Sequence, residues 1–526
     1  IGFNAATNLT TAEDGVYIGY AAGGNGTITG PYNVVIGKNA GYDLTSGSYN
    51  TLIGVDAGTN FTDNVANIAI GHGTLDAADA GEHYNIAIGH QALTTENSGA
   101  DGCIAIGYNA LQDQNVASAN NTAIGYGSAQ ELTTGTDNTF LGYFAGANGI
   151  ITGDNNCVFG TRAGFDLTSG HSNVLMGKNA GQNFTNNESN VVIGNGALES
   201  ANNGENYNIA IGAAALQTLN TTAGDGQVAI GYEALKTLNV ASPKNVAVGY
   251  QAAQGATTAT ESCFIGYESG GSGTITGDEN TCLGYRTGKD LTSGEYNVFV
   301  GKDAGEKVTT GNSNIAIGAN AMEAAQAGVT GNIAIGHAAL ATENSSADHC
   351  VAIGYAALNL QNAAAVNMAI GSYAGDAITS GTRNVLMGYR AGTALDNDND
   401  NTFVGYNAGS VNIGQKNTAV GSHALGHADC TGESNVAIGY NALGSATADE
   451  SDNIAIGDAA LYGLVNGAAD NNIGLGTDAG RYFDTDPTDT PGSGSSVNTA
   501  GANSIYIGHQ VYASSAGPSN EICIGY

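Results

Sequence analysis

One short phrase recurs along the whole chain of 526 residues and reads approximately N-x-A-I-G-Y-x-A-G/L. Examples are NVVIGKNAG from Asn33, NIAIGHQAL from Asn85 and NIAIGHAAL from Asn332. When the Gly of each IG pair is taken as a marker, about 30 copies follow one another, nearly always 17 or 18 residues apart. A unit this short cannot hold a helical pair or a propeller blade, so it predicts one turn of a β-solenoid.

The residues just before the marker indicate a strand in every turn. The positions one and three before it are mostly Ile, Val, Leu or Thr, as at Val34 and Ile36, and the position between them is often Ala. Because side chains of a strand alternate, these positions face opposite sides, and we expect both sides to be buried, as in a parallel sheet. A second apolar position, such as Leu44, predicts a second strand per turn, followed by a polar turn.

A longer period predicts how the chain is organised. Phrases of about seven turns recur from near residues 33, 156 and 280, and the pattern degenerates after residue 401. We therefore expect a solenoid shaft over 1–480, an inserted surface loop over 481–504 and the last turns over 505–526, with the array continuing beyond this segment. Insertions in solenoids form surface loops, often on a binding face, so Arg481, Tyr482 and Phe483 are candidate receptor contacts. The alternative is that this inserted segment is only a solvated bulge with no binding role.

Two rows of similar side chains are expected to stack from turn to turn. An Asn precedes the marker by four residues in most turns, and stacked amides can hydrogen-bond as a ladder. Tyr often follows the marker directly, as at Tyr108 and Tyr126, which predicts an aromatic row at a corner of the turn, or alternatively a sugar-stacking surface. The predicted amide ladder includes Asn33, Asn50, Asn67, Asn85, Asn121, Asn138, Asn156, Asn173, Asn190 and Asn208.

Net charge and the length of the apolar runs exclude two kinds of partner, nucleic acids and the interior of a membrane. The chain has 47 acidic and 13 basic residues, a formal net charge of −34, so we expect no nucleic-acid partner, because such a surface repels phosphate. No apolar run approaches 18 residues, so membrane insertion is not expected. The 81 glycines are expected largely at the markers and in the turns.

The sequence predicts no catalytic residue and no cofactor, and therefore no enzyme. The nine His residues are scattered, and the seven Cys residues are odd in number and form no C-x-x-C pair, which disfavours a disulfide framework or a zinc site. Cys103 and Cys350 take the place of the ladder Asn. The run DNDNDN with Asp396, Asp398 and Asp400 is a candidate calcium site, although no Gly or closing Glu completes an EF-hand pattern; the alternative is a solvated turn.

The repeat resembles the N-x-x-A-I-G motif of YadA-like adhesin heads. It resembles more closely the NTAIGY-x-AL…TTG arrays of tail-fibre proteins of marine phages and some bacterial surface proteins, as in NTAIGYGSAQELTTG from Asn121 and NTAVGSHAL from Asn417. The resemblance covers nearly the whole chain. It implies a left-handed, homotrimeric β-roll that serves as a structural shaft for host attachment.

That resemblance implies a location in the virion and contact with other tail or surface components, with a host glycan or protein as receptor. A bacterial surface adhesin or an extracellular filament protein is the alternative. Ice binding and polysaccharide depolymerisation are more distant alternatives: the first needs a regular Thr array and the second a cleft with carboxylates.

Overall fold

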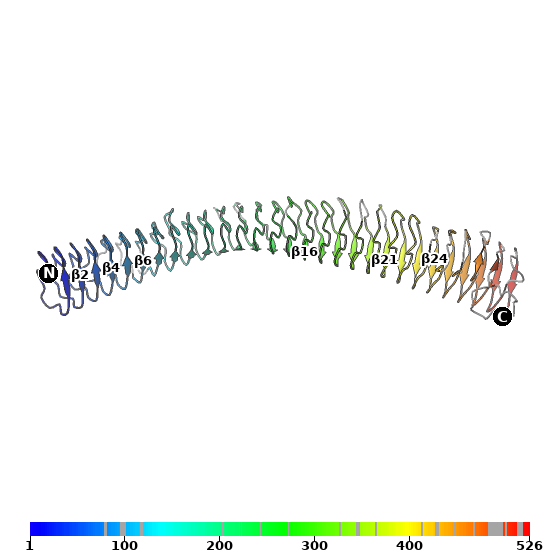
Figure 1. The fold of residues 1–526 in the computed structure, drawn as a ribbon, viewed down its shortest axis with the longest axis horizontal. Helices are drawn as coiled ribbons and strands as arrows, with labels where there is room; N and C mark the ends of the chain where they lie inside the picture. Colours follow the sequence, from blue (N-terminus) through cyan, green and yellow to red (C-terminus); the bar gives the residue numbers. More distant parts are fainter. Residues whose placement is uncertain are drawn as a thin grey trace. The chain divides into compact units, whose positions relative to one another are not determined.

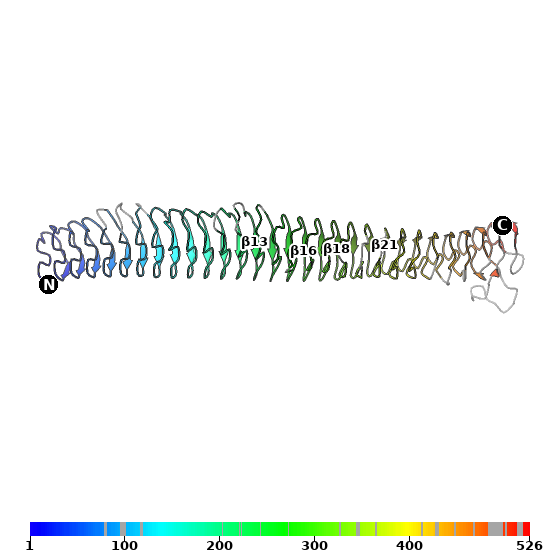
Figure 2. The same ribbon diagram turned by 90° about the horizontal axis from the view of Figure 1, so that it is seen from above.

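In the computed structural model, the chain is an all-β parallel solenoid, which confirms the predicted fold class. The structure describes residues 1–526 except 78–80, 95–100, 116–118, 202–203, 220, 222–223, 242, 272, 326–327, 343–347, 363–365, 412–413, 427–430, 446–448, 466–468, 482–497, 500–501, 513–518 and 526. The chain divides into two compact units, Ile1–Ser262 and Cys263–Tyr526. Within each unit the strands stack side by side and point the same way (Figures 1 and 2).

The first unit contains fourteen strands of three residues each. Each strand pairs in parallel with the strand of the next turn, residue for residue, so that Val34 lies beside Thr51 and Ile36 beside Ile53. The strands are β1 (Val16–Ile18), β2 (Val34–Ile36), β3 (Thr51–Ile53), β4 (Ile68–Ile70), β5 (Ile86–Ile88), β6 (Ile104–Ile106), β7 (Thr122–Ile124), β8 (Thr139–Leu141), β9 (Cys157–Phe159), β10 (Val174–Met176), β11 (Val191–Ile193), β12 (Ile209–Ile211), β13 (Val228–Ile230) and β14 (Val246–Val248).

The second unit repeats this plan with fifteen stacked strands and one separate pair, β27 with β29. The 29 stacked strands, one per turn, are slightly fewer than the predicted number of turns. The strands of this unit are β15 (Cys263–Ile265), β16 (Thr281–Leu283), β17 (Val298–Val300), β18 (Ile315–Ile317), β19 (Ile333–Ile335), β20 (Val351–Ile353), β21 (Met368–Ile370), β22 (Val385–Met387), β23 (Thr402–Val404), β24 (Thr418–Val420), β25 (Val436–Ile438), β26 (Ile454–Ile456), β27 (Leu464–Val465), β28 (Ile473–Leu475), β29 (Asn498–Thr499), β30 (Ile505–Ile507) and β31 (Ile522–Ile524).

The prediction of two strands per turn is wrong for most turns. The chain after the marker Gly37 has positive φ at Asn39 (56°) and Gly41 (51°), and again at Tyr49 (62°), so an extended strand cannot continue there. Backbone hydrogen bonds still join these turns, for example from the amide of Gly41 to the carbonyl of Ala57 (2.9 Å). In the described residues, the second apolar position forms isolated bridges, such as Leu132 with Ile151, and one short strand, β27, which pairs with β29.

The marker Gly allows successive turns to approach closely. At Gly37 φ is +142°, and a Cβ atom would lie 2.0 Å from the carbonyl oxygen of Gly54, the next marker. Gly54 is related to Gly71 in the same way. Any side chain at the marker would therefore push two turns apart, which explains why the repeat keeps glycine at this position.

The core of the solenoid lies on the side of the middle strand residue. Ala69, Ala87 and Phe140, each in the middle of its strand, are completely buried, whereas the residues on either side of them are partly exposed. The prediction that both faces of the strand are buried is therefore wrong for the single chain. The interior of a turn lies on one side of its strand, so the other face can be covered only by another molecule.

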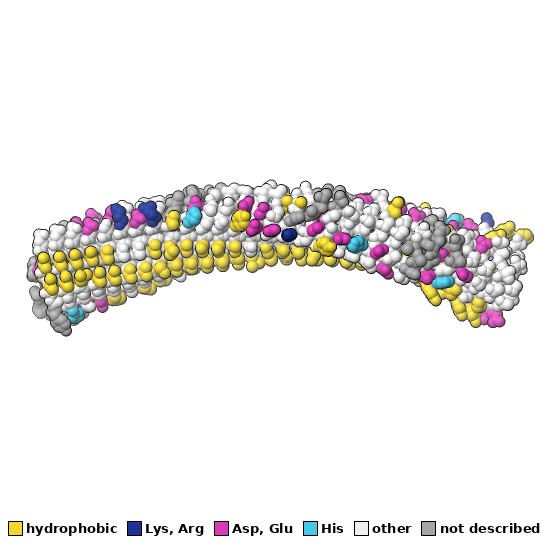
Figure 3. Space-filling model, turned by 180° about the vertical axis from the view of Figure 1, so that it is seen from behind, with side chains coloured by type: hydrophobic (Ala, Val, Ile, Leu, Met, Phe, Trp, Pro, Cys, Tyr) yellow, Lys and Arg dark blue, Asp and Glu magenta, His cyan; other side chains and the backbone are white. Residues whose placement is uncertain are grey.

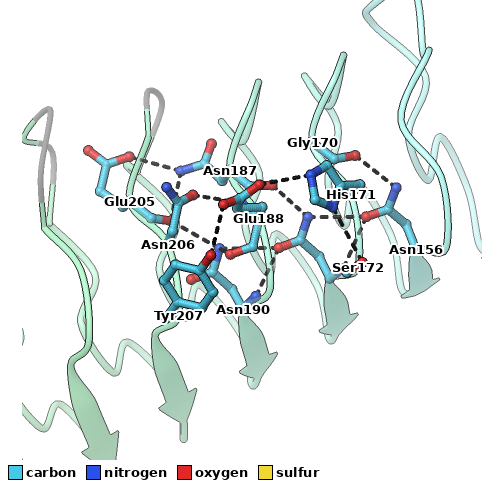
Figure 4. Close-up of polar contacts among 11 residues, drawn as sticks. Asn156, Gly170, His171, Ser172, Asn187, Glu188, Asn190, Glu205, Asn206 and Tyr207 are labelled. Carbon is cyan, nitrogen blue, oxygen red and sulfur yellow. Dashed lines mark hydrogen bonds and ion pairs between the residues drawn. The ribbon is translucent and has the colours of Figure 1, made fainter.

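The amide ladder forms as predicted. Each ladder Asn accepts at Oδ1 from the next turn: Asn156 Oδ1 accepts from the backbone N–H and from the side-chain amide of Asn173, both at 3.1 Å, and Asn190 continues the row. Asn156 also donates from Nδ2 to the carbonyl of Gly170 (2.9 Å). Figure 4 shows Asn156 and Asn190 in this row. The ladder satisfies most of its buried amides without water, whereas Asn208 Nδ2 and Asn401 Nδ2 are buried and have no partner among the described residues.

Where cysteine interrupts the ladder, a glutamine from the same turn replaces the missing acceptor. The backbone of Cys103 still donates to Asn85 Oδ1 (2.8 Å), but the amide of Asn121 in the following turn donates to Gln114 Oε1 instead (2.7 Å). The second interruption, at Cys350, is followed by the same arrangement, with Asn367 donating to Gln361 at 2.7 Å. A thiol is a poor acceptor, so each cysteine is accompanied by a new polar partner.

Candidate functional site

The outward face of the strands is an uncovered apolar surface, which we call the apolar face. It consists of the first and third residues of each stacked strand, which are mostly Ile, Val, Leu, Met or Phe with some Thr and Cys, and Figure 3 shows rows of hydrophobic side chains that run from turn to turn. In the first unit Phe159 is 48% exposed and Met176 39%, and in the second unit Leu283 is 44% exposed. Single chains seldom leave long contiguous rows of this kind in water, and such patches mark interaction surfaces.

The residue after the marker forms a second row, the aromatic row. His90, Tyr108 and Tyr126 stack with ring centroids 5.0 and 4.9 Å apart and with nearly parallel planes. Tyr389 and Tyr406 stack similarly at 5.3 Å. The predicted aromatic row is thus confirmed, and a ring inside a stack, such as Tyr108, has a neighbouring ring on both faces. A sugar cannot stack on a ring face that is already covered, so the uninterrupted parts of the row do not provide a sugar platform.

Cavities open where this row is interrupted. In the first unit Tyr20 stacks on Phe3 at 5.7 Å, but the next turn carries Lys38 at the equivalent position. A cavity of about 410 Å³ lies beside Tyr20 and is also lined by Asn39 and Tyr42. The interruption leaves one face of the tyrosine without a stacked ring.

A cavity with more polar groups lies in the second unit, and we call it the Tyr440 cavity. It has a volume of about 360 Å³ and spans three successive turns, those of β25, β26 and β28. In the next turn, the position of the aromatic row that corresponds to Tyr440 holds Asp458, which again interrupts the stacking of rings. The residues that line it are Tyr440, Asn441, Asp458, Ala459, Tyr462, Asp478 and Arg481.

The guanidinium of Arg481 is held in place at the edge of this cavity. Its Nη1 donates to Asp478 Oδ1 at 2.9 Å, and its Cζ lies 5.1 Å from the centre of the Tyr462 ring, a cation–π distance. Both Arg481 and Asp478 have less than a fifth of their side-chain surface exposed. The guanidinium is thus fixed between a carboxylate and a ring, where its positive charge lies at the edge of the cavity.

Of the three predicted receptor contacts, the structure places Arg481 in the Tyr440 cavity. Tyr482 and Phe483 lie outside the described residues, as does most of the predicted loop 481–504. Tyr440 belongs to the aromatic row that the sequence predicts, whereas Tyr462, Asp458 and Asp478 were not among the predicted contacts. The sequence contains one indication that these residues lie together, since Tyr462 and Arg481 both stand five residues after their markers. The cavity itself could not be predicted, because an interruption of the aromatic row forms a cavity only when the turns stack.

The three candidate calcium ligands have other partners in the structure. Asp400 forms a two-point ion pair with Arg383, with N–O distances of 2.6 and 2.8 Å, and Arg383 holds the pKa of Asp400 below its usual range. Asp396 accepts from the hydroxyl of Thr379, and burial raises the pKa of Asp398. Within the described ranges, no three His, Cys, Asp or Glu residues are grouped so as to hold a metal ion. Calcium binding here stays a prediction.

A polar cluster beside the amide ladder shows how exposed turn residues are used. Glu188 pairs with His171 at 2.8 Å and accepts from the hydroxyl of Tyr207 at 3.1 Å, so one carboxylate joins three successive turns (Figure 4). The contact with Glu188 raises the pKa of Tyr207. Both of these partners of the Glu188 carboxylate lie in adjacent turns, which indicates a role in stacking.

No protein-family model matches this chain, and no curated protein shows significant similarity to it. In the part of the chain that the structure describes, no helix has the length and apolar character needed to cross a membrane.

Proposed function

We propose that this protein is a non-enzymatic structural shaft that assembles as a homotrimer, as part of a phage tail fibre or a similar host-attachment fibre of a virion. The observation that carries the proposal is the apolar face. In the first unit fourteen strands each present two outward side chains, 28 in all. A stable protein interface uses about 20–30 residues per partner, so one unit alone supplies enough surface.

The strand geometry favours copies that lie parallel to one another. The apolar rows run from turn to turn, so a second copy makes continuous contact only when its rows lie alongside the first. Cyclic symmetry about a common axis achieves this and closes the assembly. The number three comes from the resemblance to YadA-like adhesin heads, which are trimeric.

Sedimentation of the full chain tests this proposal. We expect a mass of three chains in native buffer, and we expect the double variant Phe159→Glu/Met176→Glu to weaken assembly, because it places two charges in adjacent turns of the apolar face. Tyr32→Glu/Tyr49→Glu is the matched control: it adds the same two charges in adjacent turns, at side chains that are 46% and 60% exposed and outside these rows. A native monomer at micromolar concentration would contradict the proposal, as would equal effects of the two changes.

A bacterial surface adhesin or extracellular filament protein is the second candidate, and the same apolar face supports it. Neighbouring genes distinguish the two. Genes for capsid and baseplate proteins indicate a fibre, whereas genes for secretion indicate a cell-surface protein.

A further inference from the structure

The Tyr440 cavity combines groups that recognise a sugar ring. Tyr440 is 55% exposed and meets His423 only edge to face, with centroids 6.1 Å apart and planes at 79°. The next turn has Asp458 in place of a ring. The negative face of an aromatic ring attracts the slightly positive C–H groups on one side of a pyranose, and this tyrosine has room to offer such a face.

The polar groups around it suit hydroxyl groups. Asp458 and Asp478 accept hydrogen bonds, Asn441 both donates and accepts, and Arg481 donates. Hydrogen bonds to charged groups are stronger than neutral ones, and a sugar hydroxyl can donate to a carboxylate while accepting from a guanidinium. The cavity volume of about 360 Å³ is within the range of small-ligand sites.

Charge decides between neutral and acidic sugars. The Tyr440 cavity has two carboxylates and one guanidinium, and that guanidinium is already paired with Asp478. The whole chain has a net charge of −34. An anionic sugar would therefore meet repulsion both in the cavity and over the surface, whereas a neutral sugar would not.

A second cavity in the same unit has the same kinds of residue. It measures about 290 Å³ and is lined by Tyr373, Asp376, Tyr389 and Arg390, in the turns of β21 and β22. The aromatic row is also interrupted here, because Ser372 follows the marker Gly371, and the rings of Tyr373 and Tyr389 lie 6.2 Å apart and perpendicular. Two tyrosines, an arginine and at least one aspartate thus line both cavities, although at different positions of their turns.

We propose that the Tyr440 cavity binds a neutral pyranose unit of a host-surface glycan, with Tyr440 under the ring and Asp458, Asp478 and Arg481 on its hydroxyl groups. The inference rests on the proposed attachment role and names the chemical class of the receptor. It places recognition on the side of the shaft, at an interruption of the aromatic row.

Calorimetric titration of the full chain with defined hexasaccharides tests the inference. The neutral probes are the glucose, mannose and galactose oligomers with α and β linkages, and the acidic probe is oligogalacturonate. We expect at least one neutral probe to bind with a Kd below 1 mM and oligogalacturonate to bind at least tenfold more weakly. We expect Tyr440→Ala to weaken the neutral binding at least tenfold and Arg481→Ala to weaken it severalfold.

The matched control is Tyr108→Ala, at the same position of its turn but with rings stacked on both faces at 5.0 and 4.9 Å. It should leave binding unchanged. The inference is overturned if no neutral probe binds at 10 mM, if the acidic probe binds more tightly, or if the Tyr108 and Tyr440 variants lose affinity equally. Sedimentation of the same samples separates the two proposals, since a trimer that binds none of the sugars supports the shaft and refutes only the glycan site.

Discussion

In most turns two residues share the same core volume and are matched in size. Where the middle strand residue is large, as at Phe140, the residue four after the marker is usually glycine, here Gly146. Where the middle residue is alanine, as at Ala105, that position is often Leu, here Leu111, and both are completely buried. The alternation of Gly and Leu along the repeat thus reflects which of the two positions fills the core.

We expect Gly146→Ala to destabilise the protein by about 2–4 kcal/mol, the sum of left-handed strain and overpacking. At Gly146 φ is +57°, and a Cβ atom would lie 2.4 Å from the Phe140 ring. Gly73→Ala is the control, because φ is +60° there but the nearest atom would be 3.5 Å away. Thermal unfolding midpoints should fall more for the first change, and equal shifts would show that packing against Phe140 has no effect.

Loss of one asparagine from the amide ladder is expected to lower the free energy of unfolding through lost hydrogen bonds rather than through packing. Asn156→Ala removes the acceptor for the backbone and side chain of Asn173 and the donor to Gly170. Each buried polar group left without a partner costs about 1–3 kcal/mol, so we expect a loss of at least about 2 kcal/mol. Cys103→Ala, at the same position of another turn, should lower the unfolding midpoint far less, because a thiol bonds weakly. A comparable loss at both positions would contradict a role for the amide.

At the scale of the element, turns are joined by side chains of opposite charge or complementary hydrogen bonding. Arg383 and Asp400 are 17 residues apart in sequence and face each other across adjacent turns. Lys236 and Glu233, by contrast, pair within one turn at 2.5 Å. Contacts between turns determine stacking, whereas contacts within a turn affect only its own shape.

The pKa of Asp400 provides a pH test of this stacking. The ion pair lowers that pKa in the folded protein, so its contribution to stability is present above the unfolded value near 3.9 and is lost as pH falls through the lower folded value. NMR titration should show that Arg383→Gln raises the Asp400 pKa toward 3.9. An unchanged Asp400 pKa would mean that the ion pair does not form in solution, and because both groups are exposed we expect only a small change in overall stability.

At the scale of the whole molecule, the net charge of −34 opposes assembly while the apolar face favours it. Salt screens repulsion between copies, with a Debye length of about 30 Å at 0.01 M and about 3 Å at 1 M. We therefore expect the proposed trimer to dissociate less readily at 500 mM NaCl than at 10 mM. Sedimentation over a dilution series measures this, and tighter assembly at low salt would indicate that ion pairs, rather than the apolar face, hold the copies together.

Sequence alone was sufficient for the parts of this fold that repeat locally. The marker glycine, the three-residue strand and the ladder from Asn33 onward recur every 17 or 18 residues, and local geometry with identical neighbours leaves one way to stack them. The absence of a second strand from most turns could not be predicted in the same way. It depends on left-handed backbone conformations at residues such as Asn39 and Tyr49, and their side chains do not reveal these conformations. The same is true of the Tyr440 cavity, which depends on residues from three turns.

The sequence by itself determined that every turn has one strand with large apolar side chains on one face and mainly small ones on the other, but not which face is inside. The structure buries the middle residue, as at Ala69, and leaves Ile68 and Ile70 on the outside. The physical reason is the narrow interior of a single turn, which accepts one strand side chain opposite Leu75 and has no room for two isoleucines. The period and the residue types of the repeat are local properties of the chain, whereas the buried face of each strand is decided only when the turns close.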